Sequence, residues 1–123
     1  MEMKLELVPV PVTDVDRAID FYVNKVGFNL DHDHRVTESL RFVQLTPKGS
    51  ACSIVIGDAT SSMKPGTQQN LQMVVKDTVA ARDMLNKNGV KTTEIQDMPW
   101  GIFTSFADPD GNTWSLQQIK PKA

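Results

Sequence analysis

A nine-residue stretch near the N-terminus decides the fold, because the chain repeats it. Val12–Asp20 reads VTDVDRAID, and 63 positions later Val75–Asp83 reads VKDTVAARD. After a one-residue slip the match continues, and Pro47-Lys48-Gly49 returns as Pro109-Asp110-Gly111. A repeat of this length indicates one folding unit used twice, and two such units commonly meet around a shared space.

Composition places the chain among ordinary globular domains. Its 123 residues are 40% hydrophobic and 23% charged, with a net charge of −2, so we expect a single domain over residues 1–123. That charge gives no electrostatic reason to bind nucleic acid or an anionic membrane. Cys52 is the single cysteine and no apolar run reaches membrane-spanning length, so we expect no disulfide framework, no membrane partner and a reducing, cytoplasmic location.

Each copy of the repeat reads as a strand, a helix and three more strands. The first copy predicts a strand at 5–12, a helix from Thr13 or Asp14 to Gly27, and strands near 28–35, 39–46 and 51–57. The second predicts a strand at 70–75, a helix at 78–88 stopped by Gly89, and strands near 91–96, 102–107 and 113–119. Residues 57–67 are rich in small and turn-forming residues and predict a linker between modules at about 1–57 and 68–120.

Local chemistry supports these elements. Apolar residues in the first helix step by three and four, as on an amphipathic helix: Val15, Ala18, Ile19, Tyr22 and Val26. Pro9 and Pro11 stand two apart in the first strand, which fits an edge whose N–H groups on that side stay unpaired.

One helix covers one face of a sheet, so the other face must enclose a cavity or pack elsewhere. The sequence therefore predicts an α+β fold in which two tandem βαβββ modules form a curved mixed sheet around a concave cavity. Strand alternation assigns the side chains that line it. These are Leu7, Pro9, Ser53, Val55, Asn70, Gln72, Ser115 and Gln117, with Trp100 in a loop beside them as either a ligand-stacking lid or loop packing.

Other residues with reactive or aromatic side chains have plainer interpretations. His32 and His34 share one strand face, with Asp31 and Asp33 expected on the other. Such polar alternation is typical of a solvated outer strand, and the imidazoles could chelate a metal or act in catalysis only if their face turned inward.

The remaining candidates are expected to be structural. Glu6 and Cys52 have core-side alternation, and a one-residue register slip would be needed to turn Glu6 inward. Of Phe42, Phe103 and Phe106, at least two are expected in the core. Asp108 and Asp110 are expected to bond the backbone of their own turn.

The motifs resemble the vicinal oxygen chelate superfamily, which includes glyoxalase I, bleomycin-resistance proteins and extradiol dioxygenases. The resemblance rests on residues 10–22, on Gly27-Phe28, and on 106–112, which reads FADPDGN. It implies the duplicated fold over nearly the whole chain. It implies much less about activity, since this scaffold hosts lyases, isomerases, oxygenases and pure binders. Members of this size commonly form homodimers that share the cavity, and we expect a homodimer.

The resemblance also implies where a metal would bind. Enzymes of the family hold a divalent ion with a His or Gln and a Glu from each module, at positions that here are Leu7, Ser53, Asn70 and Ser115. Leucine offers no donor atom and the serines no charge, whereas a divalent transition metal prefers several imidazole, carboxylate or thiolate ligands. We therefore expect no metal and no cofactor.

The sequence favours a metal-free protein that binds a small apolar or planar molecule. Its predicted cavity lining is mostly apolar, with a few amides and hydroxyls and no acid or base placed for catalysis. The alternative is a metal-dependent lyase, isomerase or dioxygenase that uses other ligands, such as His32, His34 or Glu6. A third interpretation is a filled scaffold whose role is protein contact.

Overall fold

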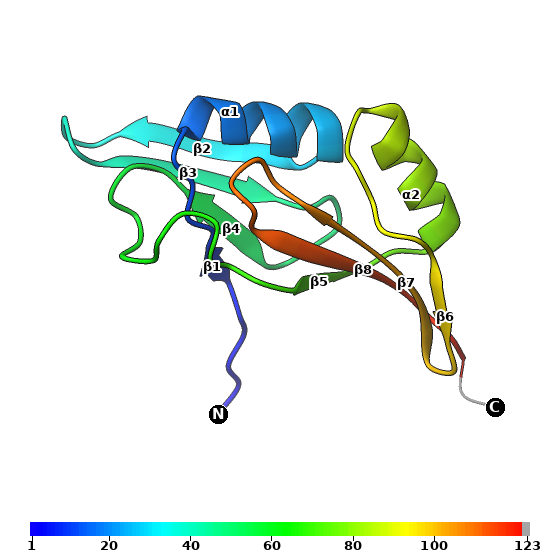
Figure 1. Ribbon diagram of the computed structural model, residues 1–123. Coiled ribbons are helices and arrows are strands. Elements are labelled where there is room, and N and C mark those ends of the chain that lie inside the picture. Colours follow the sequence, from blue (N-terminus) through cyan, green and yellow to red (C-terminus); the bar gives the residue numbers. More distant parts are fainter. Residues whose placement is uncertain (122–123) are drawn as a thin grey trace.

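The computed structural model describes residues 1–121. The chain forms two four-stranded sheets that lie side by side (Figure 1). The first has the order β1-β4-β3-β2, with β1 at Leu7–Pro9, β2 at Asn29–Arg35, β3 at Arg41–Thr46 and β4 at Ser53–Ile56. The second has the order β5-β8-β7-β6, with β5 at Leu71–Val74, β6 at Gln96–Met98, β7 at Gly101–Ala107 and β8 at Thr113–Ile119. The predicted α+β fold of two βαβββ units is confirmed. The single chain forms two separate sheets in place of one continuous curved sheet.

Both modules place their helices on the same side of the sheets (Figure 1). Helix α1 (Val15–Ile19) continues as the wider-turned helix η1 (Asp20–Val26), and helix α2 spans Thr78–Lys87. The repeated aspartates cap them, because Asp14 accepts from the N–H of Arg17 and Asp77 from the N–H of Ala80, each at 3.0 Å. No helix in residues 1–121 is long and apolar enough to span a membrane.

Gly27 ends the first helix with φ +99°, as the sequence predicts. Its own N–H and that of Phe28 both donate to the Tyr22 carbonyl, at 2.9 and 2.8 Å. These two bonds satisfy a carbonyl group that a helix end would otherwise leave free, and they turn the chain directly into β2.

Two strand predictions are wrong in extent or place. The strand expected at 5–12 is regular only at Leu7–Pro9, and the one expected at 91–96 forms at Gln96–Met98. Thr93 explains the second shift. Its backbone N–H donates to the Ser105 carbonyl, but its hydroxyl, not its carbonyl, accepts the return bond from the Ser105 N–H, each at 2.9 Å. A side chain thus replaces part of the strand ladder.

The prolines of the first strand sit at a sheet edge, as expected. The Val10 N–H donates to the Val55 carbonyl at 3.0 Å, and the Ser53 N–H to the Glu6 carbonyl at 2.7 Å. Alternate residues of β1 therefore bond β4, and Pro9 lies between them with its backbone directed to the open edge.

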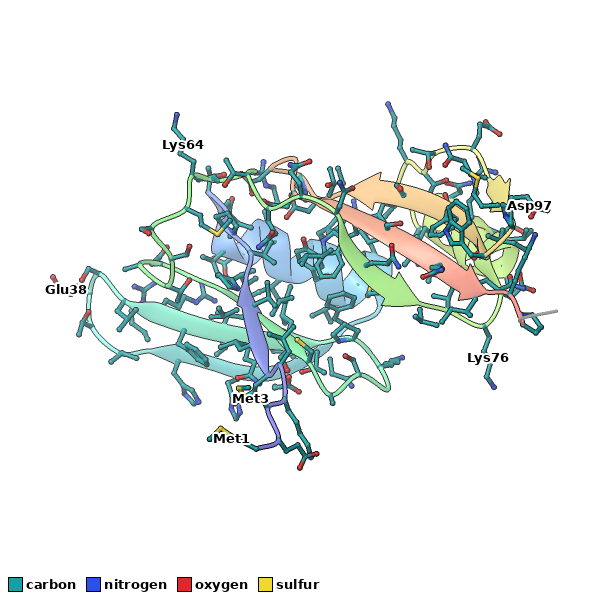
Figure 2. All side chains as sticks on the ribbon, turned by 90° about the horizontal axis from the view of Figure 1, so that it is seen from below. Met1, Met3, Glu38, Lys64, Lys76 and Asp97 are labelled. Carbon is teal, nitrogen blue, oxygen red and sulfur yellow. The ribbon has the colours of Figure 1, made fainter. Side chains whose placement is uncertain are left out.

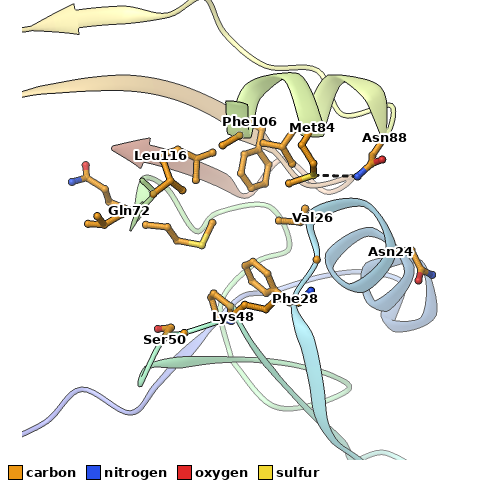
Figure 3. A pocket seen from close by; sticks show the side chains of 18 residues that line it. Asn24, Val26, Phe28, Lys48, Ser50, Gln72, Met84, Asn88, Phe106 and Leu116 are labelled. Atoms are coloured by element: carbon orange, nitrogen blue, oxygen red, sulfur yellow. Dashed lines mark hydrogen bonds between the residues drawn. The ribbon is translucent and has the colours of Figure 1, made fainter. Parts of the chain in front are cut away.

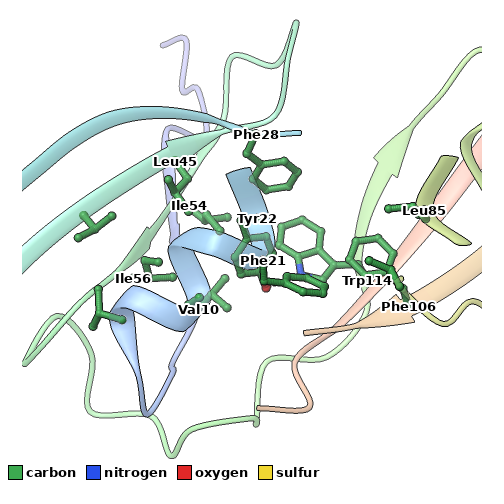
Figure 4. Packing of buried hydrophobic residues seen from close by; sticks show 14 of the residues in the cluster. Val10, Phe21, Tyr22, Phe28, Leu45, Ile54, Ile56, Leu85, Phe106 and Trp114 are labelled. Atoms are coloured by element: carbon green, nitrogen blue, oxygen red, sulfur yellow. The ribbon is translucent and has the colours of Figure 1, made fainter. Parts of the chain in front are cut away.

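An aromatic cluster joins the modules. Tyr22 and Phe28 from the first module pack against Trp114 from the second, with ring centroids 5.8 and 5.5 Å from that indole, and Phe21 lies 6.1 Å from Phe106 (Figure 4). All five rings are buried. Leu85 and Val90 join this cluster from α2 and the loop after it, so the core is continuous across the repeat.

Loop contacts fix the modules further. The Asn112 side-chain amide donates to the Pro11 carbonyl at 2.8 Å, where the Gly66 N–H also donates at 3.2 Å. The Gln68 side chain donates to the Pro9 carbonyl at 2.9 Å. The segment between the modules is therefore bonded to the connection between β1 and α1.

Candidate functional site

The helix-free face is the side of both sheets that points away from α1 and α2 (Figure 2). By strand register it carries most of the predicted lining. In the first module, β1 and β4 run parallel with Leu7 opposite Ser53 and Pro9 opposite Val55. Directly opposed residues share a face, so these four side chains lie together as predicted. Ser53 and Val55 are each only 5% exposed, on the inner strand β4 at the centre of this sheet.

A directed chain of hydrogen bonds crosses that centre. The Gln44 amide donates to the Ser53 hydroxyl at 3.3 Å, the Ser53 and Thr46 hydroxyls lie 2.6 Å apart, and the Thr46 hydroxyl donates to the Asp31 carboxylate. Since the one Thr46 proton goes to Asp31, Ser53 must donate to Thr46. The hydroxyl of Ser53 is thus fixed by the protein itself and is not a free nucleophile.

A β-bulge turns the histidines onto the helix-free face. The register between β2 and β3 shifts between Leu30 and His32, after which His32 faces Gln44 and His34 faces Phe42. Asp31 is the extra residue and also reaches this face, where it meets Thr46. The prediction that Asp31 lies opposite the histidines is therefore wrong. The predicted exposure is confirmed, since every residue of β2 is exposed.

The two imidazoles stack, with ring centroids 5.8 Å apart and planes inclined by 29°. Asp33 keeps the other side of β2, where the Arg41 guanidinium binds it through bonds of 3.0 and 2.9 Å. The hydrogen bond from Arg41, more than its charge, lowers the pKa of the Asp33 carboxyl below its ordinary value. Arg41 also forms a salt bridge with Asp16 of α1. Asp33 and Asp16 therefore both bind Arg41 on the side of the first sheet that the helix covers.

The second module presents amides and an aromatic ring. Gln72 lies opposite Ser115, and Gln117 lies between Val74 and Phe103 in adjoining strands. The Gln72 amide donates to the Gln117 carbonyl oxygen at 2.6 Å. A Cβ at Gly101 would stand 2.9 Å from the Gln117 amide nitrogen, so this glycine gives the Gln117 side chain its room.

Two aromatic residues expected in the core belong to this face. Phe106 is buried, whereas Phe42 and Phe103 are half-buried beside His34 and Gln117. The prediction that at least two of these three are core residues is wrong. Cys52, expected to be buried, is half-buried ahead of β4.

Exposed apolar side chains gather at one end of the second sheet. Met98 and Ile119 both lie opposite Gly101, and Trp100 occupies the turn between β6 and β7 with 61% of its surface exposed. This exposure does not fit packing within the loop, which was one of the two roles predicted for Trp100. The other role, stacking on a ligand, stays a prediction. With Val74 these side chains form an apolar rim beside the glutamines.

Asn70, another predicted lining residue, lies just before β5 and outside the paired strands. It precedes β5 with φ +57°, and its N–H donates to the Thr113 hydroxyl at 2.8 Å. Ser115 lies opposite Gln72, just as Ser53 lies opposite Leu7. The sequence repeat aligns Leu7 with Asn70 because it follows the helix caps, but β1 is two residues farther from its helix than β5 is.

These positions do not fit a divalent metal. By sheet register the four candidate ligands are Leu7, Ser53, Gln72 and Ser115, which provide one amide, two hydroxyls and no charge. No group of three or more His, Cys, Asp or Glu side chains in residues 1–121 is arranged to hold a metal ion. The one-residue slip that would turn Glu6 inward is not present, since Leu7 keeps its register with Ser53.

A hollow lies between the two modules, and residues from both faces of β5 line it: Gln72 and Val74 as well as Met73 and Val75. This inter-module cleft has a volume of about 660 Å³ (Figure 3). Its walls come from the end of η1, the β3–β4 turn, β5 and α2, and its apolar lining includes Val26, Phe28, Met73, Val75, Met84, Phe106 and Leu116. The polar residues that line the cleft include Lys48, Ser50 and Asn88.

Comparison with known proteins agrees with this geometry. A family model of the Glyoxalase/Bleomycin resistance protein/Dioxygenase superfamily matches residues 4–116, and the chain belongs to that superfamily. An uncharacterized protein, YetH, from Bacillus subtilis (strain 168) is 30% identical over 122 residues, which cover 96% of this chain and all of that protein.

Among solved structures, the chain is similar to TnmS3, an antibiotic binding protein from Streptomyces sp. CB03234. The two share 36% identity with a TM-score of 0.88, over 97% of this chain and 98% of TnmS3. A glyoxalase/bleomycin resistance protein from the same organism is 37% identical with a TM-score of 0.84, over 94% of this chain and 100% of that one.

Proposed function

We propose that the chain binds a small apolar or planar molecule on the helix-free face without a metal ion, as a sequestering protein and not as an enzyme. The observation that carries this proposal is the Leu7–Ser53 and Gln72–Ser115 pairing, which puts a leucine and two serines at three of the four positions where the metalloenzymes of the superfamily place ligands. Similarity to an antibiotic binding protein supports it.

The lining suits such a ligand. Phe42, Phe103 and Trp100 offer ring surfaces for stacking, and the paired glutamines Gln72 and Gln117 offer fixed hydrogen-bond groups. Preformed sites of this kind select a molecule through shape and a few polar contacts.

A thermal-shift screen of planar aromatic metabolites and antibiotics tests the proposal. A ligand that binds only the folded protein raises the melting temperature in a saturable manner. At least one such compound is expected. A screen of broad chemical range without a stabiliser would favour a scaffold that serves only protein contact.

The enzymatic alternative has one observation in its favour, because the bulge in β2 turns His32 and His34 onto the helix-free face. Elemental analysis of protein purified without a tag separates the two functions. We expect substoichiometric metal. Near-stoichiometric zinc, nickel, manganese or iron that is lost in a His32→Ala, His34→Ala double variant would establish the metal-dependent alternative.

The proposal extends to the setting of the protein. The whole chain forms one domain of two modules, at about 1–57 and 68–120, and works as a homodimer in the cytoplasm. The lone Cys52 supports the reducing location, and the open helix-free face supports pairing, since it leaves Val74, Trp100 and Ile119 at least 59% exposed.

A further inference from the structure

The inter-module cleft is bridged by a hydrogen bond between the modules. The Asn88 side-chain amide, at the end of α2, donates to the Lys25 carbonyl in η1 at 3.0 Å. The same amide lies 3.2 Å from the Met84 sulfur (Figure 3). The ends of the two helices are thus fixed relative to each other, and the hollow beside them is already formed without a ligand.

The apolar walls of the cleft come from both modules. Phe28 stands on the first-module wall, and Phe106 and Leu116 stand on the second-module wall (Figure 3). These three side chains are 5%, 4% and 3% exposed, so packing fixes their positions. Met73 and Met84 also line the cleft, and flexible methionine side chains adapt to ligands of different shape. With a volume of about 660 Å³, the cleft has the size of a site for a small organic molecule.

Most polar side chains of the cleft already donate hydrogen bonds within the protein. These are Asn24 to Asp20, Ser50 to the Cys52 carbonyl, Gln72 to Gln117 and Asn88 to the Lys25 carbonyl. Lys48 is the exception among the described lining residues, because its exposed side chain has neither a hydrogen bond nor an ion pair within residues 1–121. Its ammonium group keeps three donors for a ligand.

Lys48 also gives the cleft its charge. No aspartate or glutamate lines it in the described part of the chain. A cationic ligand would meet a like charge and no carboxylate, and a neutral ligand would gain nothing from the ammonium charge. The lysine stem can lie along apolar surface while its charged end stays in water. The cleft therefore suits a molecule with an apolar body and one negative charge.

We propose that the inter-module cleft is a second binding site, which takes a small amphipathic carboxylate. The apolar part of the ligand lies between Phe28 and Leu116, where it is removed from water, and the carboxylate pairs with the Lys48 ammonium. The aromatic side chains of the helix-free face, Phe42, Trp100 and Phe103, do not line this cleft. Binding here therefore does not depend on the function proposed for that face.

Calorimetric titration of the full chain with decanoate and decylammonium tests the charge of the ligand. The two ions share one alkyl chain and are used below the concentrations at which they form micelles. Decanoate should bind in a saturable manner. Decylammonium should bind at least about fivefold more weakly, because Lys48 attracts one ion and repels the other. Equal affinities for the two ions, or no binding of decanoate, would overturn the proposal.

Lys48→Met removes the charge and keeps an apolar stem. The variant should weaken decanoate binding about threefold to fivefold, as expected for an exposed ion pair, and should leave the binding of uncharged decanol unchanged. Lys64→Met is the matched control, since Lys64 is also exposed but does not line the cleft. Equal losses in the two variants would mean that net charge, and not a contact in the cleft, attracts the anion, which would contradict the proposal.

Filling the cleft locates the site. Ala81 is half-buried on α2 and lines the cleft, whereas Ala80 is exposed on the same helix and does not. Ala81→Phe should weaken decanoate binding at least about tenfold, because the ring takes the space of the alkyl chain. Ala80→Phe should leave it unchanged, and circular dichroism checks that both variants fold. Should Ala81→Phe fail to fold, the comparison of Lys48→Met with its control decides, since both lysines are exposed.

The helix-free face is tested separately. Phe103→Ala should leave decanoate binding unchanged, because Phe103 does not line the cleft. Loss of decanoate binding in Phe103→Ala, with binding retained in Ala81→Phe, would move the ligand to the helix-free face and overturn the second site. A protein that binds decanoate but is stabilised by no aromatic compound would refute the proposed function alone, and the reverse result would refute the second site alone.

Discussion

The Tyr22 hydroxyl donates to the Asp108 carboxylate at 2.8 Å and accepts from the Trp114 indole N–H at 2.9 Å, and these bonds join the two modules inside their shared core. Asp108 in turn accepts from the Asn112 side chain at 2.8 Å and from the Asn112 N–H at 3.0 Å. The helix of one repeat is thus bonded to the last turn of the other, as well as packed against it.

Replacement of Tyr22 by phenylalanine should lower the free energy of unfolding by about 1–3 kcal/mol. The ring and its packing remain, but the Trp114 indole loses its acceptor and Asp108 loses a donor in a buried place. Urea unfolding of both proteins measures the difference. A Tyr22→Phe variant as stable as the parent would show that the module contact depends on packing alone.

The protein should also lose stability at alkaline pH through the same residue. Burial first, and then the charge of Asp108, raises the pKa of Tyr22 far above its ordinary value near 10. Because the folded state holds the proton more tightly, this contribution is complete below about pH 10 and is lost progressively as the pH rises above it.

Tyr22 is the single tyrosine of the chain, so phenolate absorbance reports it directly. The absorbance should appear only as near-ultraviolet circular dichroism is lost. Phenolate formation near pH 10 in protein that keeps its native spectrum would contradict the buried hydroxyl.

The sequence predicted those parts of the fold that depend on local chemistry. Asp14 and Asp77 cap their helices as expected, and the strand predicted at 113–119 has those bounds in the structure. Alternation within β4 and β8 correctly placed Ser53, Val55, Ser115 and Gln117, because a regular strand keeps its period of two.

The errors arise where the pairing between strands changes which residues lie opposite one another. The bulge after Leu30 adds one residue to β2, which brings Asp31 and the histidines to the same face, and nothing in the run DHDH marks it. Asn70 was assigned from the helix caps, but the register of β5 against β8 puts Gln72 in that place. Both outcomes depend on neighbours distant in sequence.

Two glycines with nearly the same φ angle allow the cost of backbone strain to be measured apart from the cost of a steric clash. Gly49 has φ +83° with nothing within 4 Å of an added Cβ, whereas Gly66 has φ +81° and its Cβ would stand 2.2 Å from the Asp110 carbonyl oxygen. Gly49→Ala should cost about 1–2 kcal/mol from the left-handed backbone alone. Gly66→Ala should cost more in the same denaturation assay, since the loop must also move away from Asp110. Equal losses of stability in the two variants would mean that the 57–67 linker moves away from Asp110 at no cost.

Acid should weaken the contact between β2, β3 and α1. The pKa of Asp33 is lowered by its hydrogen bonds from Arg41, so its contribution is present above the unfolded value near 4 and is lost as the pH falls through the lower, folded value. The Asp33→Asn variant should be less stable than the parent at neutral pH and should lose less stability on acidification. Melting temperatures between pH 3 and pH 7 test this, and parallel curves for the two proteins would contradict it.

Phe103 should contribute directly to ligand binding. It is half-buried on the helix-free face, between Gln117 and Gln96, where a planar molecule would cover its ring. Phe103→Ala should weaken the affinity for a stabilising compound by about tenfold or more, because an aromatic contact contributes about 1.5–3 kcal/mol. Val79→Ala is the control, since Val79 is 51% exposed on α2, away from that face. Calorimetric titration measures both variants, and a similar loss in each would place the ligand elsewhere than on the helix-free face.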